Sequence, residues 1–92
     1  MTFKIHWRGR LRNMIHQFVF LEMELYGNSH RIEYALSDIE RQLSEEPSGV
    51  GESREPNERV SISKPLTVLY EVFADAGVVV IYRMIHHEYG SF

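Results

Sequence analysis

The chain contains no cysteine, so neither a disulfide nor a thiolate metal site can form, and a reducing cytoplasm is the expected compartment. Its longest early apolar run, Phe18 to Leu21, is too short for a signal peptide or a membrane span, so a soluble protein without membrane contact is expected. Internal repeats and low-complexity tracts are also lacking. At 92 residues, the sequence predicts one domain over 1–92.

A strongly basic balance is also lacking, because the net charge is −3. The charges are nevertheless segregated: residues 1–21 carry +4, residues 22–58 carry −7, and residues 59–92 carry equal numbers of acids and bases. A dedicated nucleic-acid binder usually has a clearly basic domain. Any contact with a polyanion is therefore expected to be local.

The stretch from Val60 to His87 has the clearest strand pattern. Apolar and polar residues alternate over 60–63 and 66–73, with Pro65 at a bend between the two strands. Asp75, Ala76 and Gly77 predict a turn, and an apolar run from Val78 to Tyr82 predicts a central strand. An earlier alternation over 3–7 predicts a short first strand with Phe3, Ile5 and Trp7 facing inward.

Two helices are predicted between the first strand and this hairpin. The first runs from Arg8 to Gly27 and has an apolar face at three- and four-residue steps. Near its end this face includes either Leu21 or Glu22, followed by Leu25. Ser29 can cap the second helix, and Pro47 ends it. Its stripe is Ile32, Ala35, Leu36, Ile39 and Leu43. The polar segment 47–58 is expected to be a loop.

The predicted fold is therefore α+β, with an antiparallel β-sheet of about four strands packed against an N-terminal helical hairpin in the order β-α-α-β-β-β. Three segments carry a resemblance to a known family: residues 35–47 at the end of the second helix, PLTVLYEV over 65–72, and VVIYRMIH over 79–86. In order and spacing, nearly the whole chain resembles the RelE/ParE superfamily, the toxins of bacterial type II toxin-antitoxin pairs.

The resemblance implies a cognate antitoxin as a partner, and it leaves two activities open. RelE-like members cleave messenger RNA on the ribosome, using the RNA 2′-hydroxyl as the nucleophile. ParE-like members bind and poison DNA gyrase without an established catalytic reaction. A third alternative is an inactive relative that binds an antitoxin or a second copy of itself as a homodimer.

An RNA cleavage needs groups for proton transfer and cations for the charge on phosphorus. His86 and His87 are the candidates for proton transfer, because a histidine titrates near neutral pH. Adjacent residues on a strand point to opposite faces, so one of the two is expected to reach a site, and unbroken alternation pairs His87 with Ile81, Arg83 and Ile85. The catalytic candidates are His86, His87 and Arg83.

Arg59 and Lys64 could hold phosphate with Arg83, while Tyr89 or Phe92 could stack on a base. Two departures from the nuclease pattern stand out: Thr67 occupies the position of a family arginine, and Glu58, Val60 and Ser61 stand where several members carry lysines. No metal or other cofactor is expected, because adjacent histidines diverge and no third ligand has a diagnostic spacing.

The alternation also predicts a surface for binding. Leu69, Phe73, Val79, Ile81 and Ile85 are expected on the strand face opposite to Leu66, Val68, Tyr70 and Val72. If the two helices cover one face, the other exposes apolar side chains. If Arg83 and one histidine share a surface with Arg59 or Lys64, the pattern favours a nuclease, and if the cations are scattered, it favours a binding module.

Overall fold

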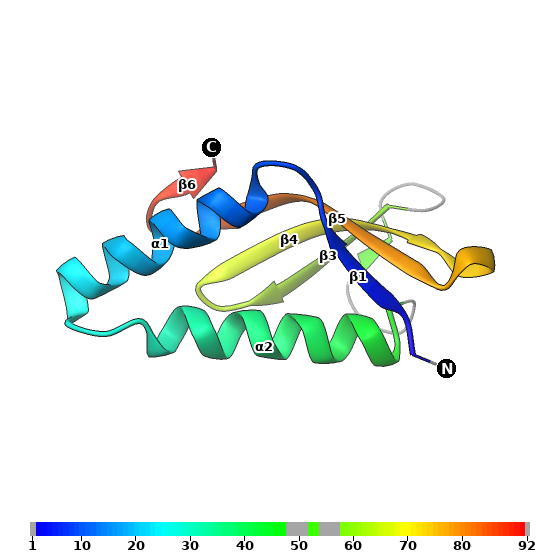
Figure 1. The fold of residues 1–92 in the computed structure, drawn as a ribbon, viewed down its shortest axis with the longest axis horizontal. Helices are drawn as coiled ribbons and strands as arrows, with labels where there is room; N and C mark the ends of the chain where they lie inside the picture. Colours follow the sequence, from blue (N-terminus) through cyan, green and yellow to red (C-terminus); the bar gives the residue numbers. More distant parts are fainter. Residues whose placement is uncertain (1, 48–51, 54–57, 92) are drawn as a thin grey trace.

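The computed structural model describes residues 2–47, 52–53 and 58–91, and it confirms an α+β fold in which a helical hairpin packs on one face of a sheet (Figure 1). The helices are α1 (Leu11–Tyr26) and α2 (His30–Glu45). The strands are β1 (Lys4–Trp7), β2 (Glu52–Ser53), β3 (Glu58–Ser63), β4 (Leu66–Phe73), β5 (Val78–His86) and β6 (Gly90–Ser91). The short β2 lies in a segment predicted as a loop.

The sheet order is β1-β5-β4-β3-β2, and β6 also pairs with β5. The β3-β4-β5 meander is antiparallel, as predicted, but β1 runs parallel to β5 with Lys4 opposite Val78 and Trp7 opposite Ile81. The sheet is therefore mixed rather than antiparallel throughout. A parallel neighbour arises because the helical hairpin carries the chain from the end of β1 back across the sheet.

The two helices behave largely as their apolar stripes predict. In α2, the side chains of Ile32, Ala35, Ile39 and Leu43 are fully buried against the sheet. Gly27 ends α1 with a φ of 76°, a left-handed conformation that favours glycine. The Ser29 hydroxyl does not cap α2 but donates to Glu33 instead.

In α1 the buried face consists of Leu11, Met14, Phe18 and Glu22, so Glu22 rather than Leu21 completes the stripe. Leu25, predicted on the same face, is 60% exposed. Figure 1 shows why: the last turns of α1 extend beyond the strands toward the tip of the helical hairpin. The core is thus shorter than the apolar stripe of α1.

A register shift between Leu69 and Tyr70 of β4 changes which residues of β5 face the helices. Before the shift Tyr70 pairs with Ile81, and after it Leu69 pairs with Arg83, so Tyr82 is the extra residue of a β-bulge. The buried residues of β5 are consequently Val79, Ile81, Met84 and His86. The expectation that Val79 and Ile81 lie on the open face is wrong, because Ile81 pairs with the buried Tyr70 and Val79 pairs with Val72, which packs against the core.

Candidate functional site

The two adjacent histidines at the end of β5 lie in opposite environments. His86 points into the core and is completely buried, whereas His87 is exposed. The alternation of strand side chains predicts this divergence. A residue that transfers a proton to RNA must reach the RNA, so the assignment of His86 as a catalytic candidate is not compatible with its position.

The His86 ring is enclosed by aromatic side chains and held in one tautomer. Its centroid lies 4.2 Å from that of Tyr89 and 5.1 Å from that of Phe18. The backbone N–H of Glu88 donates to Nδ1 at 3.1 Å, so the proton of the neutral ring is on Nε2. Nε2 has no hydrogen-bond partner among the described residues, and the nearest carboxylate oxygen, Glu22 Oε2, is 3.9 Å away.

Glu22 is a carboxylate buried to 99%, and Arg31 neutralises it. The Arg31 guanidinium donates from Nε to Oε1 at 2.8 Å and from its terminal nitrogen to Oε2 at 2.9 Å. The same guanidinium donates to Glu88 at 2.9 Å, and the Tyr26 hydroxyl donates to Glu88 at 2.8 Å. This group, which we call the Glu22 network, joins α1, α2 and the turn after β5 into one unit.

The electrostatics of the Glu22 network favour an ionised Glu88 and a neutral His86. Hydrogen bonds from Arg31 and Tyr26 lower the pKa of Glu88, and the hydrogen bonds that Arg31 donates to Glu22 and Glu88 raise the pKa of Arg31. Burial lowers the pKa of His86, although the nearby carboxylates act in the opposite direction. A neutral histidine in a closed aromatic site is a packing residue at ordinary pH.

His87 and Arg83, by contrast, lie on the open face of the sheet. Beyond the bulge, Arg83 pairs with Leu69 and Ile85 pairs with Thr67, and His87 follows at the same two-residue spacing. His87 Nε2 forms a hydrogen bond of 2.7 Å with the Thr67 hydroxyl. Thr67 thus holds the exposed histidine.

Lys64 lies near His87, because it occupies the turn between β3 and β4. The backbone N–H of His87 donates to the carbonyl of the next turn residue, Pro65, at 2.9 Å. The exposed side chains of Lys64 and His87 are therefore placed at the same end of the sheet. Three predicted site residues, Arg83, His87 and Lys64, thus lie at one end of the open face or beside it.

The remaining predicted site residues lie elsewhere. Arg59 pairs with the fully buried Tyr70, so Arg59 belongs to the helix-covered face. Burial raises the pKa of the Tyr70 hydroxyl, and the nearby Arg59 acts in the opposite direction. Tyr89 is half-buried against His86, with its hydroxyl 3.4 Å from Glu22. Phe92 is outside the described residues.

Apolar side chains occupy much of the open face between these polar groups. Ile62 is 62% exposed and Phe73 is 43% exposed, and further apolar residues on this face are half-buried. Those half-buried residues are Val60, Leu69, Val78, Val80 and Ile85. The Tyr82 hydroxyl donates to Glu58 at 2.9 Å on the same face. An apolar sheet face with a polar end is suited to binding a macromolecule.

The described residues contain no group of three or more histidines, aspartates or glutamates placed to hold a metal ion. None of the helices in the described part of the chain is long and apolar enough to cross a membrane.

The signal for the Glu22 network was present in the sequence but incomplete. Glu22 occupies a position of the apolar stripe of α1, which indicates a buried carboxylate that needs a partner. Nothing in the spacing identifies Arg31 as that partner, because it comes from the other helix.

Taken together, the order β-α-α-β-β-β, the helical hairpin and the β3-β4-β5 meander define a RelE/ParE-like fold. Two solved structures share it. A chain of the toxin-antitoxin complex RelBE2 from Mycobacterium tuberculosis superposes with a TM-score of 0.68 and 22% identity, covering 94% of this chain and 99% of that one. A chain of the chromosomal ParDE toxin-antitoxin system from P. aeruginosa gives a TM-score of 0.70 and 13% identity, covering 92% and 96%.

At these identities the likeness shows the fold and not the activity. No protein-family model matches the chain, and no curated protein matches it either.

Proposed function

We propose that this chain is the toxin of a toxin-antitoxin pair and that it acts by binding its target through the open face of the sheet. The observation that carries the proposal is the likeness over nearly the full length of both chains to proteins of two toxin-antitoxin systems. The partner is a cognate antitoxin, and the compartment is the cytoplasm. Both follow from this role.

Binding is favoured over catalysis by the positions of the polar groups. His86 is buried in the core, Arg59 lies on the helix-covered face, and Thr67 stands where the resemblance to the nuclease pattern implies an arginine. The loss of one donor to a developing anionic charge costs about two to three orders of magnitude in comparable sites. The open face keeps its apolar side chains available for a protein target such as DNA gyrase.

The first test is growth after induced expression in a bacterial host. Wild-type protein is expected to arrest growth, and co-expression of the gene next to its own is expected to restore it. Ile62→Glu places a charge on the open face and is expected to relieve the arrest. Tyr34→Glu is the matched control, because Tyr34 is 72% exposed on α2, away from that face.

Normal growth while soluble wild-type protein accumulates would contradict the toxin proposal. Equal relief by both glutamate variants would contradict the role of the open face. A supercoiling assay with purified gyrase and wild-type protein then asks whether gyrase is the target.

Ribosome-dependent cleavage of messenger RNA is the second candidate, and one observation favours it. Arg83 and His87 lie on one face, with Lys64 in the turn beside His87. His87 would then transfer the proton while Arg83 and Lys64 hold phosphate.

Cell-free translation tests this candidate, with reporter yield and messenger integrity both measured. Cleavage that His87→Ala abolishes and His6→Ala preserves would support the nuclease, since His6 is an exposed histidine on β1. Intact messenger at full yield would rule out cleavage under these conditions.

A further inference from the structure

A groove lies between the two helices, on the side of the hairpin away from the open face of the sheet. Its volume is about 330 Å³, and Trp7, Ile15 and Leu36 supply its apolar surface. Trp7 comes from β1, which in Figure 1 runs from beside the end of α2 to the start of α1, while the other two come from α1 and α2. The proposed functions above do not use this groove.

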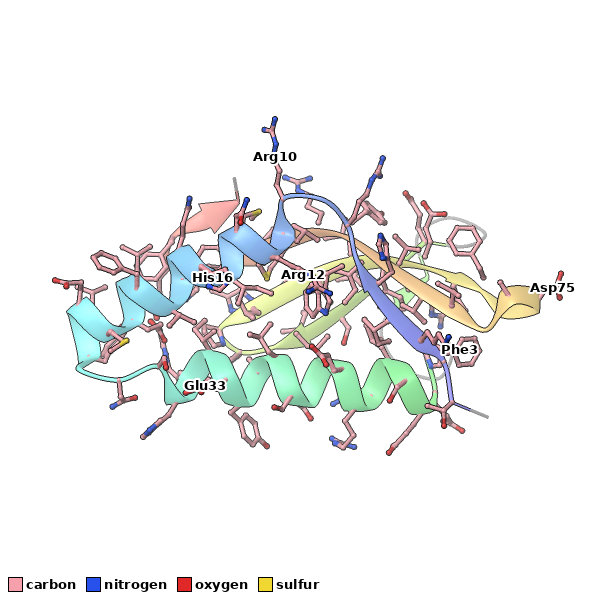
Figure 2. The ribbon with its side chains drawn as sticks, viewed as in Figure 1. Phe3, Arg10, Arg12, His16, Glu33 and Asp75 are labelled. Atoms are coloured by element: carbon pink, nitrogen blue, oxygen red, sulfur yellow. The ribbon has the colours of Figure 1, made fainter. Side chains whose placement is uncertain are left out.

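The two walls of the groove carry opposite charges. Arg12 and His16 line it from α1, and Glu40 lines it from α2. Figure 2 shows His16 and Glu33 at similar positions along the molecule on the two facing helices. Within the described part of the chain, neither Arg12 nor Glu40 forms an ion pair or a hydrogen bond. The groove therefore has a basic wall, an acidic wall and an apolar base.

The apolar surface continues from the groove along α1. His16 also lines a second hollow of about 370 Å³ with Gln17, Phe20 and Leu21. Phe20 is 64% exposed and Met23 is 55% exposed, although both belong to a helix with a well-defined buried face. Large apolar side chains gathered beside a groove with charged walls are typical of a protein interface.

We propose that the occupant of this groove is the same groove of a second copy of the chain, in a two-fold symmetric dimer. A two-fold axis along the groove places α1 of the partner over α2 of the first copy. Arg12 of each copy then faces Glu40 of the other, and the exposed apolar side chains of α1 are covered. Each contact therefore occurs twice in the interface.

Charge complementarity selects this arrangement. With the axis across the groove instead, α1 would face α1 and α2 would face α2, so arginine would meet arginine and glutamate would meet glutamate. A partner segment with charges of one sign would be attracted by one wall and repelled by the other. A second copy satisfies both walls at once, because its own groove has Arg12 on the α1 wall and Glu40 on the α2 wall.

The test is the dimer dissociation constant, measured by sedimentation equilibrium over a wide concentration range. Arg12→Glu and Glu40→Arg are each expected to weaken the dimer roughly tenfold or more, because each change replaces two attractions by two repulsions. The double variant Arg12→Glu/Glu40→Arg is expected to recover the wild-type constant, since the two walls have exchanged their charges.

Matched controls separate this effect from net charge. Arg10→Glu matches the charge change of Arg12→Glu at a side chain that points away from the groove in Figure 2. Asp75→Arg matches the charge change of Glu40→Arg at the distant tip of the β4-β5 hairpin. Both controls are expected to dimerise as the wild type does. Circular dichroism and thermal unfolding confirm that each variant is folded.

A wild-type protein that stays monomeric throughout would overturn the proposal, and so would a double variant that fails to recover. An equal loss in Arg10→Glu and Arg12→Glu would also overturn it. A dimer that Ile62→Glu disrupts and the groove variants preserve would assign self-association to the open face instead. None of these outcomes depends on whether the chain arrests growth.

Discussion

The two faces of the sheet use similar residues for different purposes. On the helix-covered side, His86 of β5, Arg59 of β3 and Glu22 of α1 are ionisable residues placed among apolar side chains. On the open face, His87 and Arg83 are exposed and lie beside half-buried aliphatic residues. The helix-covered face is thus a hydrophobic core that includes ionisable residues, whereas the open face is a solvent-accessible surface that includes apolar residues.

The histidine pair shows most directly what this difference teaches. His86 and His87 are adjacent and chemically identical, yet one ring is enclosed by Phe18 and Tyr89 while the other contacts Thr67. Residue type suggests a chemistry, but access to solvent decides whether the residue can perform it. The role of a polar residue on the covered face is therefore in stability and not in binding or catalysis.

The largest effect is expected from a matched pair of truncations in β5. Ile81→Ala removes a fully buried side chain and is expected to lower the free energy of unfolding by about 3 kcal/mol. Ile85→Ala makes the same change at a half-buried residue on the open face and is expected to cost about 1 kcal/mol. Urea unfolding measures both, and equal losses would contradict the assignment of faces.

Removal of the cation from the Glu22 network comes next. Arg31→Met leaves the buried Glu22 carboxylate without its partner and is expected to cost about 2 kcal/mol, below the usual range for a buried pair because Arg31 is 43% exposed. Arg41→Met is the control, since its pairs with Asp38 and Glu45 are on the surface. Its cost is expected to be within about 0.5 kcal/mol. A similar cost for both would show that Glu22 does not depend on Arg31.

A pH dependence should distinguish the two histidines. Burial lowers the pKa of His86 below its ordinary value of 6.5, so the unfolded chain binds a proton there that the folded chain does not. The contribution of neutral His86 to the free energy of unfolding is complete above pH 6.5, and it is lost as the pH falls from 6.5 through the pKa of His86 in the folded protein. The other ionisable groups that act on this ring are Glu22 and Arg31 of the two helices, Glu88 of the turn and the adjacent His87.

Urea unfolding between pH 7.5 and 5.5 measures the slope of the free energy of unfolding against pH. His86→Leu removes the titrating group and is expected to flatten it, whereas His87→Ala is expected to keep it. The lowered pKa of Glu88 acts below its ordinary value of 4.5, outside this window. An unchanged slope in His86→Leu would assign the pH dependence to another group.

The smallest effect on stability is expected for Ile62→Glu on the open face, within about 0.5 kcal/mol because the side chain is 62% exposed. The same variant is expected to relieve growth arrest. A large loss of stability would make the growth result a folding defect and not a binding defect, so thermal unfolding should accompany the growth assay.

The fold was largely predictable because its elements have simple periods. The stripe of α2 and the alternation in β4 each repeat over several turns or residues, and both lie where they were predicted. The parallel pairing of β1 was not predictable, because alternation identifies a strand but not its neighbour. The overhang of α1 was also missed, since a stripe does not show where the surface beneath it ends.

The site was less predictable, because one extra residue changes the face of every residue before or after it. The bulge at Tyr82 keeps Arg83 and His87 together but separates both from Ile81. Arg59 illustrates a second limit: alternation placed it on the strand, but only the pairing with Tyr70 shows which face it occupies.

The parallel pairing of β1 with β5 also has a consequence for how the chain folds as it is synthesised. Lys4 is translated early, but its neighbour in the sheet is Val78, and the helical hairpin made in between packs on β3 and β5 as well as on β1. Until those strands emerge from the ribosome, the apolar stripes of both helices have no sheet to cover. A nascent chain therefore exposes apolar surface through most of its translation, and it acquires the completed sheet only when β5 is available.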